Sequence, residues 1–199
     1  MLRLPLRLLP LRLLLAIASL FAMLQPATGA AGDLRYVIDK SASRVDAKVP
    51  FFGIASKTAR FPDMSGTFSL SFANMEALNM VVDIDARTLT TGDSQTKTLR
   101  GKQFFDVARH PTVRFVGRKL NMTGERTATV EGDITARGIT RPIRLDVTFS
   151  VPPISTGGSL PISIVGKGVI DRRKFGMTAY PWIIGAMVNV TISARMVPG

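Results

Sequence analysis

Strict alternation of apolar and polar residues constrains this chain more than any other feature of its sequence. A two-residue period is that of β-strands, whose successive side chains point to opposite faces. Strands with one apolar and one polar face are typical of antiparallel sheets, not of parallel sheets buried on both sides. The alternating segments, about nine, are 34–38, 45–51, 68–72, 80–86, 113–115, 128–136, 143–149, 162–170 and 188–195.

A sheet of this size loses its exposed edges when it closes, and about eight strands leave an interior that side chains fill or that holds one small ligand. An outer-membrane barrel would also alternate, but many charges on the polar faces and one Trp with two Tyr, too few for aromatic girdles, argue against it. A β-sandwich with a solid core and a lipocalin-like barrel with an apolar cavity both stay open. Small residues on the inward faces favour a cavity but would equally relieve curvature: Ala47, Ala86, Gly132, Gly166 and Gly168.

One stretch, residues 99–115 (LRGKQFFDVARHPTVRF), interrupts the alternation. It contains the adjacent rings Phe104 and Phe105, the only histidine of the chain, and Pro111, which returns the backbone to an extended conformation. We expect this stretch to fold across the mouth of the barrel and to place its two aromatic rings over the apolar interior.

Two short helices are predicted. The first covers 94–100, with Asp93 as its N-cap and Gly101 at its end, and a weaker candidate covers 54–61. Helices this short are marginal in water, so the first must dock on an apolar surface through Leu99 and the aromatic pair that follows it.

The first thirty residues have the pattern of a secretory signal peptide. Three arginines precede an apolar run of twelve residues, and small residues suited to cleavage follow near Ala30 or Ala31. Twelve residues fall short of the roughly 20 that span a bilayer. We therefore predict a signal peptide over 1–30 and one exported domain over 31–199. The absence of cysteine excludes disulfides, thiol chemistry and an N-terminal lipid anchor.

The exported part remains basic. Of 26 Lys and Arg residues, three lie in the predicted signal peptide, which leaves 23 against 14 acidic residues and a net charge of +9. Such a charge attracts anionic surfaces, including phosphate headgroups, or simply solvates the outer face of the protein. Because the longest basic run is the triplet at 172–174, we expect no nucleic-acid partner.

Few residues suggest catalysis. Asp106 and His110 are four residues apart, like a base and the group that orients it, but Pro111 biases His110 away from a helix. Asp83 and Asp85 share a strand face, which a solvated surface explains better than a cation site. One histidine without cysteine makes zinc binding a poor fit. We predict no catalytic residue, metal or cofactor.

The segment 171–176 (DRRKFG) ends an alternating strand with positive charge, an aromatic ring and a glycine. At a barrel mouth this arrangement would suit an amphipathic ligand, with the charge near a polar head and the ring near a hydrocarbon. An ordinary turn with solvated basic residues explains it equally well.

Several stretches together resemble the YceI-like family of exported bacterial proteins: YVIDKSASRV, SGTFSLSF, LTTGD, LRGKQFFDVARHPTVRF, GDITARGITRPIRLDVTF and DRRKFGM. The resemblance covers residues 34–196. It implies an all-β fold, an extended antiparallel lipocalin-like barrel with one or two short helices at its mouth. It also implies a periplasmic protein that binds polyisoprenoids or similar long-chain amphipathic lipids, with no established enzymatic activity.

The resemblance implies the following site. The FFD motif falls on Phe104, Phe105 and Asp106, and the D-R-x-x-F-G motif on Asp171, Arg172, Phe175 and Gly176. We predict that the apolar channel is lined by Val45, Val49, Phe51, Phe68, Leu70, Phe72, Leu99, Phe104, Phe105, Phe115 and Phe175. The candidates for headgroup contact are Arg100, His110 and Arg172. Many family members have a histidine after the second strand, where this chain has Phe51 and Phe52, with Lys57 or Arg60 as substitutes.

The function predicted from these features is binding of a long-chain amphipathic lipid, for sequestration, transport or stress-related handling. Two alternatives stay open: a hydrolase or isomerase of lipid-like substrates that uses Asp106 and His110, and a solid-cored structural or stress protein without a ligand. Stable membrane insertion after signal cleavage is not expected. Such barrels can form a homodimer through an edge or a mouth, but no residue argues for one.

Overall fold

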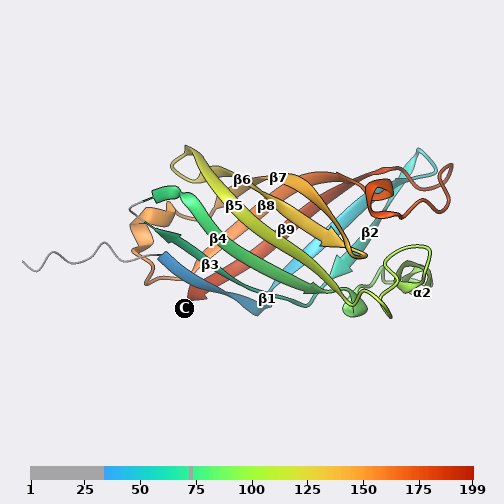
Figure 1. Ribbon diagram of the computed structural model, residues 1–199, viewed down its shortest axis with the longest axis horizontal. Helices are drawn as coiled ribbons and strands as arrows, with labels where there is room; N and C mark the ends of the chain where they lie inside the picture. Colours follow the sequence, from blue (N-terminus) through green and yellow to red (C-terminus); the bar gives the residue numbers. More distant parts are fainter. Residues whose placement is uncertain (1–33, 72–73) are drawn as a thin grey trace, which may run out of the picture. The chain divides into compact units, whose positions relative to one another are not determined.

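A computed structural model describes residues 34–71 and 74–199, and in these ranges it contains nine strands, one α-helix and three 3-10 helices (Figure 1). The strands are β1 (Leu34–Phe51), β2 (Ala55–Phe61), β3 (Met64–Ser71), β4 (Asn74–Asp85), β5 (Thr112–Gly124), β6 (Thr127–Ala136), β7 (Ile139–Phe149), β8 (Ile162–Asp171) and β9 (Met187–Pro198). The helices are η1 (Ala86–Thr88), α2 (Gln95–Arg100), η2 (Pro153–Thr156) and η3 (Arg172–Phe175). The predicted signal peptide, residues 1–30, lies outside the described residues.

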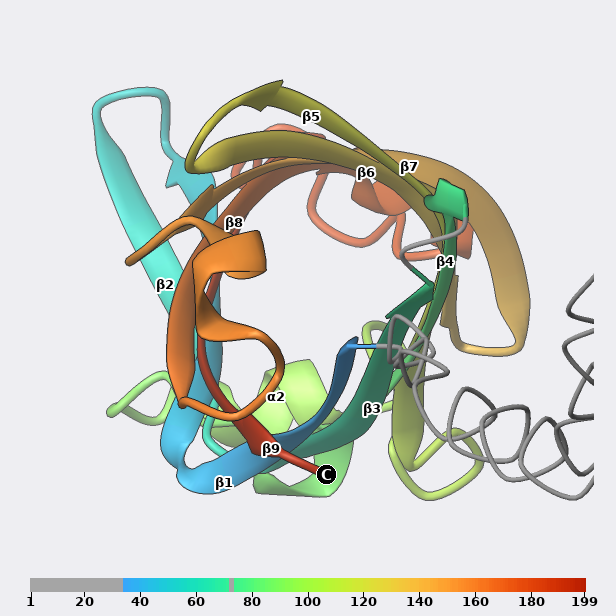
Figure 2. The same ribbon diagram turned by 90° about the vertical axis from the view of Figure 1, so that its left-hand side faces the viewer.

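Eight strands form a closed antiparallel barrel in the order β1-β3-β4-β5-β6-β7-β8-β9, with β9 pairing back onto β1 (Figure 2). The apolar face of each strand points inward and forms one hydrophobic core. Closure gives every barrel strand a partner on both sides, which removes the exposed edges. The predicted all-β lipocalin-like barrel is confirmed. In the described ranges, no helix has the length and apolar character needed to cross a membrane.

The first two predicted strands are the two halves of one long bent strand, β1. The register between β1 and β9 shifts between Asp39 and Arg44. At this bend the Asp39 carboxylate accepts hydrogen bonds from the backbone N–H and the hydroxyl of Ser41, at 3.0 and 2.6 Å. The irregularity redirects the strand, so that its first half pairs with β3 and its second half with β2.

The helix predicted over 54–61 is wrong, because this segment forms strand β2. It pairs with β1 along its whole length, and its two buried residues, Ala59 and Phe61, have the two-residue spacing of a strand. Since β9 covers the other edge of β1, β2 continues the line of β3 on the edge that remains. Pairing with that edge outweighs the weak local preference for a helix.

Connections between strands gather at the two ends of the barrel. The end that carries α2, here called the α2 end, holds the connections 52–54, 62–63, 86–111, 137–138 and 172–186 (Figure 1). The described connections of the opposite end are 125–126 and 150–161. Arg137 and Gly138 form the tight hairpin turn between β6 and β7, with positive φ angles of 52° and 73°.

Candidate functional site

The interior of the barrel holds an apolar cavity with a free volume of about 50 Å³. Its lining has no polar surface and comes from every one of the eight barrel strands. The lining residues are Ile38, Val45, Met64, Phe68, Met80, Val82, Ile84, Phe115, Leu120, Val130, Leu145, Val147, Phe149, Ile164, Gly166, Ile192, Ala194 and Met196. An empty apolar space of this kind stays dry, so it offers burial but no hydrogen bonds.

This cavity is smaller than the long channel that the family resemblance implies, since pockets for drug-sized ligands hold about 300–1,000 Å³. Inward side chains occupy most of the barrel. A Cβ on Gly132 would lie 2.2 Å from the carbonyl oxygen of Val116 and 2.9 Å from the ring of Phe115. That glycine therefore serves close packing of ring and strands. At Gly166 the nearest atoms lie at 3.6 Å, and this glycine borders the cavity.

Three of the lining residues, Met64, Met80 and Met196, have flexible side chains. A methionine side chain is unbranched, has three rotatable bonds and fills irregular space. Rotation of these side chains would enlarge the cavity without breaking a strand pair.

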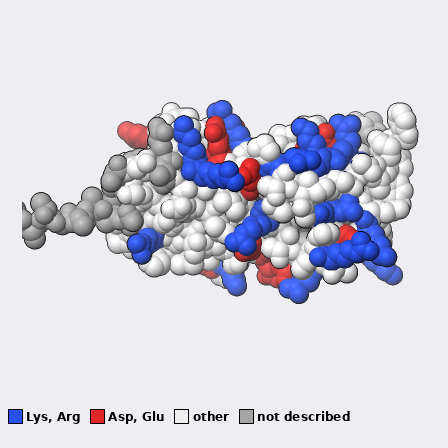
Figure 3. All heavy atoms as spheres, viewed as in Figure 1, with Lys and Arg blue, Asp and Glu red and all other residues white. Residues whose placement is uncertain are grey.

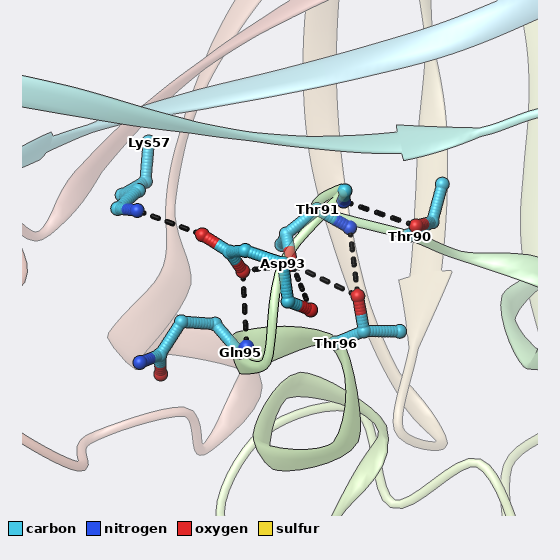
Figure 4. A network of polar contacts seen from close by, with 7 residues as sticks. Lys57, Thr90, Thr91, Asp93, Gln95 and Thr96 are labelled. Carbon is cyan, nitrogen blue, oxygen red and sulfur yellow. Dashed lines mark hydrogen bonds and ion pairs between the residues drawn. The ribbon is translucent and has the colours of Figure 1, made fainter.

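The connection 86–111 is fastened to β2 by polar contacts (Figure 4). The Asp93 carboxylate accepts from Lys57 Nζ at 2.8 Å, from the Thr91 hydroxyl at 2.6 Å and from the Gln95 N–H at 2.9 Å. These contacts, that of Lys57 foremost, lower the pKa of Asp93 to about 2. Although Ser94 is the N-cap of α2 and makes no side-chain capping bond, the predicted Asp93 does bind the first turn of the helix.

The aromatic pair of the same connection packs at the α2 end, and neither ring lines the cavity. Phe104 is buried and stacks on Tyr180, with ring centroids 6.2 Å apart and an interplanar angle of 12°. Phe105 makes an edge contact with Phe61 of β2 at 5.3 Å. Leu99, at the end of α2, also packs against the core. The rings thus join the connection 86–111 to β2 on one side and to the connection 172–186 on the other.

Arg172 organises the connection 172–186 from inside. Its side chain is 4% exposed, and burial lowers the pKa of its guanidinium. The guanidinium donates four hydrogen bonds of 2.5–2.9 Å to backbone carbonyls. The accepting residues are Met177, Ala179, Ile184 and Gly185. Four of its five N–H donors therefore hold this connection closed, which gives Arg172 a structural role.

Arg137 joins the two large connections of the α2 end. Its guanidinium donates to the carbonyl of Gly176 at 2.5 Å and to the carbonyl of Lys102 at 3.1 Å. Gly176 adopts a left-handed φ of 74° that ends η3, where a side chain would be strained. The long-range bonds of Arg137, across 35 and 39 residues, leave no pattern in the sequence.

The structure separates the predicted channel residues into groups. Val45, Phe68 and Phe115 line the cavity, and Leu70 is buried in the core without lining it. Half-buried Val49 and Phe51 lie in the part of β1 that pairs with β2. Four others belong to the connections of the α2 end, and Phe72 lies outside the described residues. Those four are Leu99, Phe104, Phe105 and Phe175. Contact of these residues with a ligand stays a prediction.

The other charged candidates also have partners within the protein. Arg100 donates twice to the carbonyl of Leu89, at 2.7 and 3.0 Å. Lys57 pairs with Asp93, and Arg60 pairs with Asp46 at 2.9 Å. These contacts fasten the connection 86–111 internally and to β2, and they join β2 to β1.

No hydrogen bond between the side chains of Asp106 and His110 occurs in the described structure. They are linked through the backbone, where the His110 N–H donates to the Asp106 carbonyl at 2.9 Å. Asp106 is buried and has a positive φ of 46°, as a turn residue does. Among residues 34–71 and 74–199, no group of three acidic or histidine side chains could hold a metal ion.

Comparison with known proteins shows to which family this barrel belongs. The model of the YceI-like domain matches residues 36–196. The chain belongs to the YceI-like family. The UPF0312 protein of Pseudomonas syringae pv. tomato is 34% identical over 167 residues, which cover 82% of this chain and 86% of the relative. The UPF0312 protein of Pseudomonas fluorescens is 30% identical over 145 residues, which cover 71% and 76%.

Solved structures share the YceI-like fold. Burkholderia cenocepacia BcnA has a TM-score of 0.69 and 20% identity, and the match covers 79% of this chain and 98% of that one. A polyisoprenoid binding domain from Saccharophagus degradans, implicated in plant cell wall breakdown, has a TM-score of 0.62 and 16% identity, with coverage of 82% and 98%. At these identities the likeness concerns the fold.

Proposed function

We propose that this protein binds a long-chain amphipathic lipid, of polyisoprenoid type, inside its barrel in the periplasm. The observation that carries the proposal is the dry, wholly apolar lining contributed by all eight barrel strands. Membership of the YceI-like family and the polyisoprenoid binding of one structural neighbour support the ligand class. The signal-peptide pattern of the first thirty residues supports the location.

Binding requires the barrel to open, because about 50 Å³ is too little for a prenyl tail. Each buried CH₂ group of a hydrocarbon tail gains about 0.8 kcal/mol, so a tail of several isoprene units offsets a considerable reorganisation. The three methionines of the lining provide movable side chains, while the strand ladder stays intact. An affinity dominated by burial tolerates different headgroups, with Arg100 and His110 remaining the predicted headgroup contacts.

Cavity-filling variants test the proposal. The protein is incubated with a prenyl alcohol, a prenyl phosphate and a prenyl quinone of equal chain length, and the lipid that co-elutes in gel filtration is quantified. We expect uptake of all three by the unaltered protein and a graded loss in Gly166→Val and Gly166→Phe, which fill the cavity. Val165→Leu, on the outward face of the same strand, should bind normally. Equal uptake by all four proteins would place the lipid outside the barrel.

A further inference from the structure

Two adjacent loops at the α2 end expose large apolar side chains. Trp182 is 94% exposed, Ile54 95%, Phe52 59% and Tyr180 47%. These four residues are here called the apolar tip. They lie in the connections 52–54 and 172–186, which are hydrogen bonded to each other from Phe52 N–H to Ile183 O at 2.8 Å.

The backbone holds the tip in place. A second bond fastens the connection 172–186 to the end of β1, from the Gly185 N–H to the Pro50 carbonyl at 2.9 Å. The Tyr180 carbonyl accepts the N–H groups of both Ile183 and Ile184. Phe52 has a φ of 53°, which is unfavourable for a bulky side chain and marks a constrained turn. Ile54 and Trp182, held almost fully exposed in this way, add nothing to the core and call for a partner.

Positive charge is concentrated behind the tip (Figure 3). The connections of the α2 end carry nine basic residues against three acidic ones, Asp63, Asp93 and Asp106. The basic residues are Arg87, Lys97, Arg100, Lys102, Arg109, Arg137, Arg172, Arg173 and Lys174. Of these, Arg172 is buried, and Arg87 and Arg173 form ion pairs with Asp85 and Asp171 at the adjoining strand ends. The described connections of the opposite end carry one of each sign, Glu125 and Arg126. The protein therefore has one strongly basic end, and it is the end with the apolar tip.

This combination fits the surface of an anionic membrane. Tryptophan favours the headgroup level of a bilayer, where its ring is buried and its N–H meets water. Lys and Arg side chains near the surface are attracted by anionic lipids. A stable protein–protein interface buries about 800 Å² on each partner. Two protruding loops are instead suited to insertion into the headgroup layer of a lipid bilayer.

We propose that the apolar tip inserts into the headgroup layer of a membrane rich in anionic phospholipid, with the exposed basic side chains of the α2 end, Lys97, Lys102, Arg109 and Lys174, on the lipid phosphates. This peripheral docking goes beyond the lipid-binding function and does not depend on what the barrel holds. It directs the α2 end, with its fastened connections, toward the bilayer.

Vesicle binding tests the docking. The purified protein without its signal peptide is sedimented with vesicles of phosphatidylcholine alone or mixed with phosphatidylglycerol. We expect binding to the mixed vesicles, weakened by salt, and a blue shift of the fluorescence of Trp182, the only tryptophan of the chain. Ile54→Ser should weaken binding about tenfold or more, given the burial of one large side chain. Lys102→Glu with Lys174→Glu should weaken binding to the mixed vesicles and reduce its salt dependence.

Matched controls keep the result specific. Leu160→Ser removes an equally apolar side chain that is 59% exposed at the opposite end, and it should bind vesicles normally. Gly166→Phe should lose lipid uptake but still bind vesicles. Ile54→Ser should lose vesicle binding but still take up a prenyl probe that is added in detergent. The two variants therefore distinguish a failure of membrane docking from a failure of the proposed lipid binding inside the barrel.

Three results would overturn the docking proposal. The first is equal binding to both kinds of vesicle. The second is an unchanged Trp182 emission spectrum on binding. The third is a dimer in the absence of lipid that Trp182→Ser abolishes, since it would assign the tip to a second copy of the chain.

Discussion

Replacement of Arg172 by methionine should loosen the connection 172–186 and destabilise the protein. The substitution removes four hydrogen bonds from a buried guanidinium to carbonyl oxygens. Hydrogen bonds to charged groups contribute about 1.5–3 kcal/mol each, but they are not additive and the freed carbonyls partly regain water. A loss of about 3 kcal/mol in the free energy of unfolding follows. For a domain of this size, that lowers Tm by about 6–12 °C.

Thermal unfolding followed by circular dichroism measures the loss, and the fluorescence anisotropy of Trp182 reports on the connection itself. We expect lower anisotropy in Arg172→Met, and also in Arg172→Lys because one ammonium group cannot reach all four carbonyls. The neighbouring Arg173 is exposed and pairs with Asp171 at 2.8 Å, so Arg173→Met should change Tm little and leave the anisotropy unaltered. Equal behaviour of Arg172→Met and Arg173→Met would refute the assigned role of Arg172.

Three further predictions concern packing and pH. Gly132→Ala should lower the free energy of unfolding by about 1–3 kcal/mol through overpacking, whereas Gly166→Ala should change it by less than about 1 kcal/mol; a chemical denaturation series that ranks the two equally would contradict the packing described. Because the pKa of Asp93 falls from 3.8 to about 2 on folding, its contribution to stability is complete above pH 3.8 and is lost as the pH falls through about 2; acid unfolding of Asp93→Asn should show less of this loss, and an unchanged acid profile would argue against it. Phe104→Ala should lower the free energy of unfolding by about 3–5 kcal/mol. It should also shift the ring resonances of Tyr180 in NMR spectra, and unchanged resonances would contradict the stacking of the two rings.

The barrel was predictable from the sequence because alternation reports directly on which face of a strand is buried. Alternation of the kind seen at Val45 and Val49 needs no knowledge of distant partners. The prediction failed at 54–61, where pairing with the free edge of β1 decided the structure. The sequence pattern also predicted two strands where the structure has the single bent strand β1, because a bulge interrupts the alternation without ending the strand.

The site was less predictable, because its geometry depends on contacts between segments far apart in the chain. The aromatic pair at 104–105 stood out as an interruption of the alternation, and its docking followed from the marginal stability of short helices. The roles of Arg137 and Arg172 did not follow, since a basic residue in a turn has the same sequence pattern whether it faces solvent or binds carbonyls. The size of the cavity was equally hidden, since it depends on how Phe115 packs over Gly132.

Native mass spectrometry of the protein, purified from its own cells and again after incubation with long prenyl lipids, tests the central claim most directly. The account predicts one lipid-sized adduct for each chain, retained when the ions are desolvated gently and absent from Gly166→Phe. A protein that is empty on isolation and stays empty with every prenyl lipid would contradict the claim and leave a barrel whose core serves stability alone.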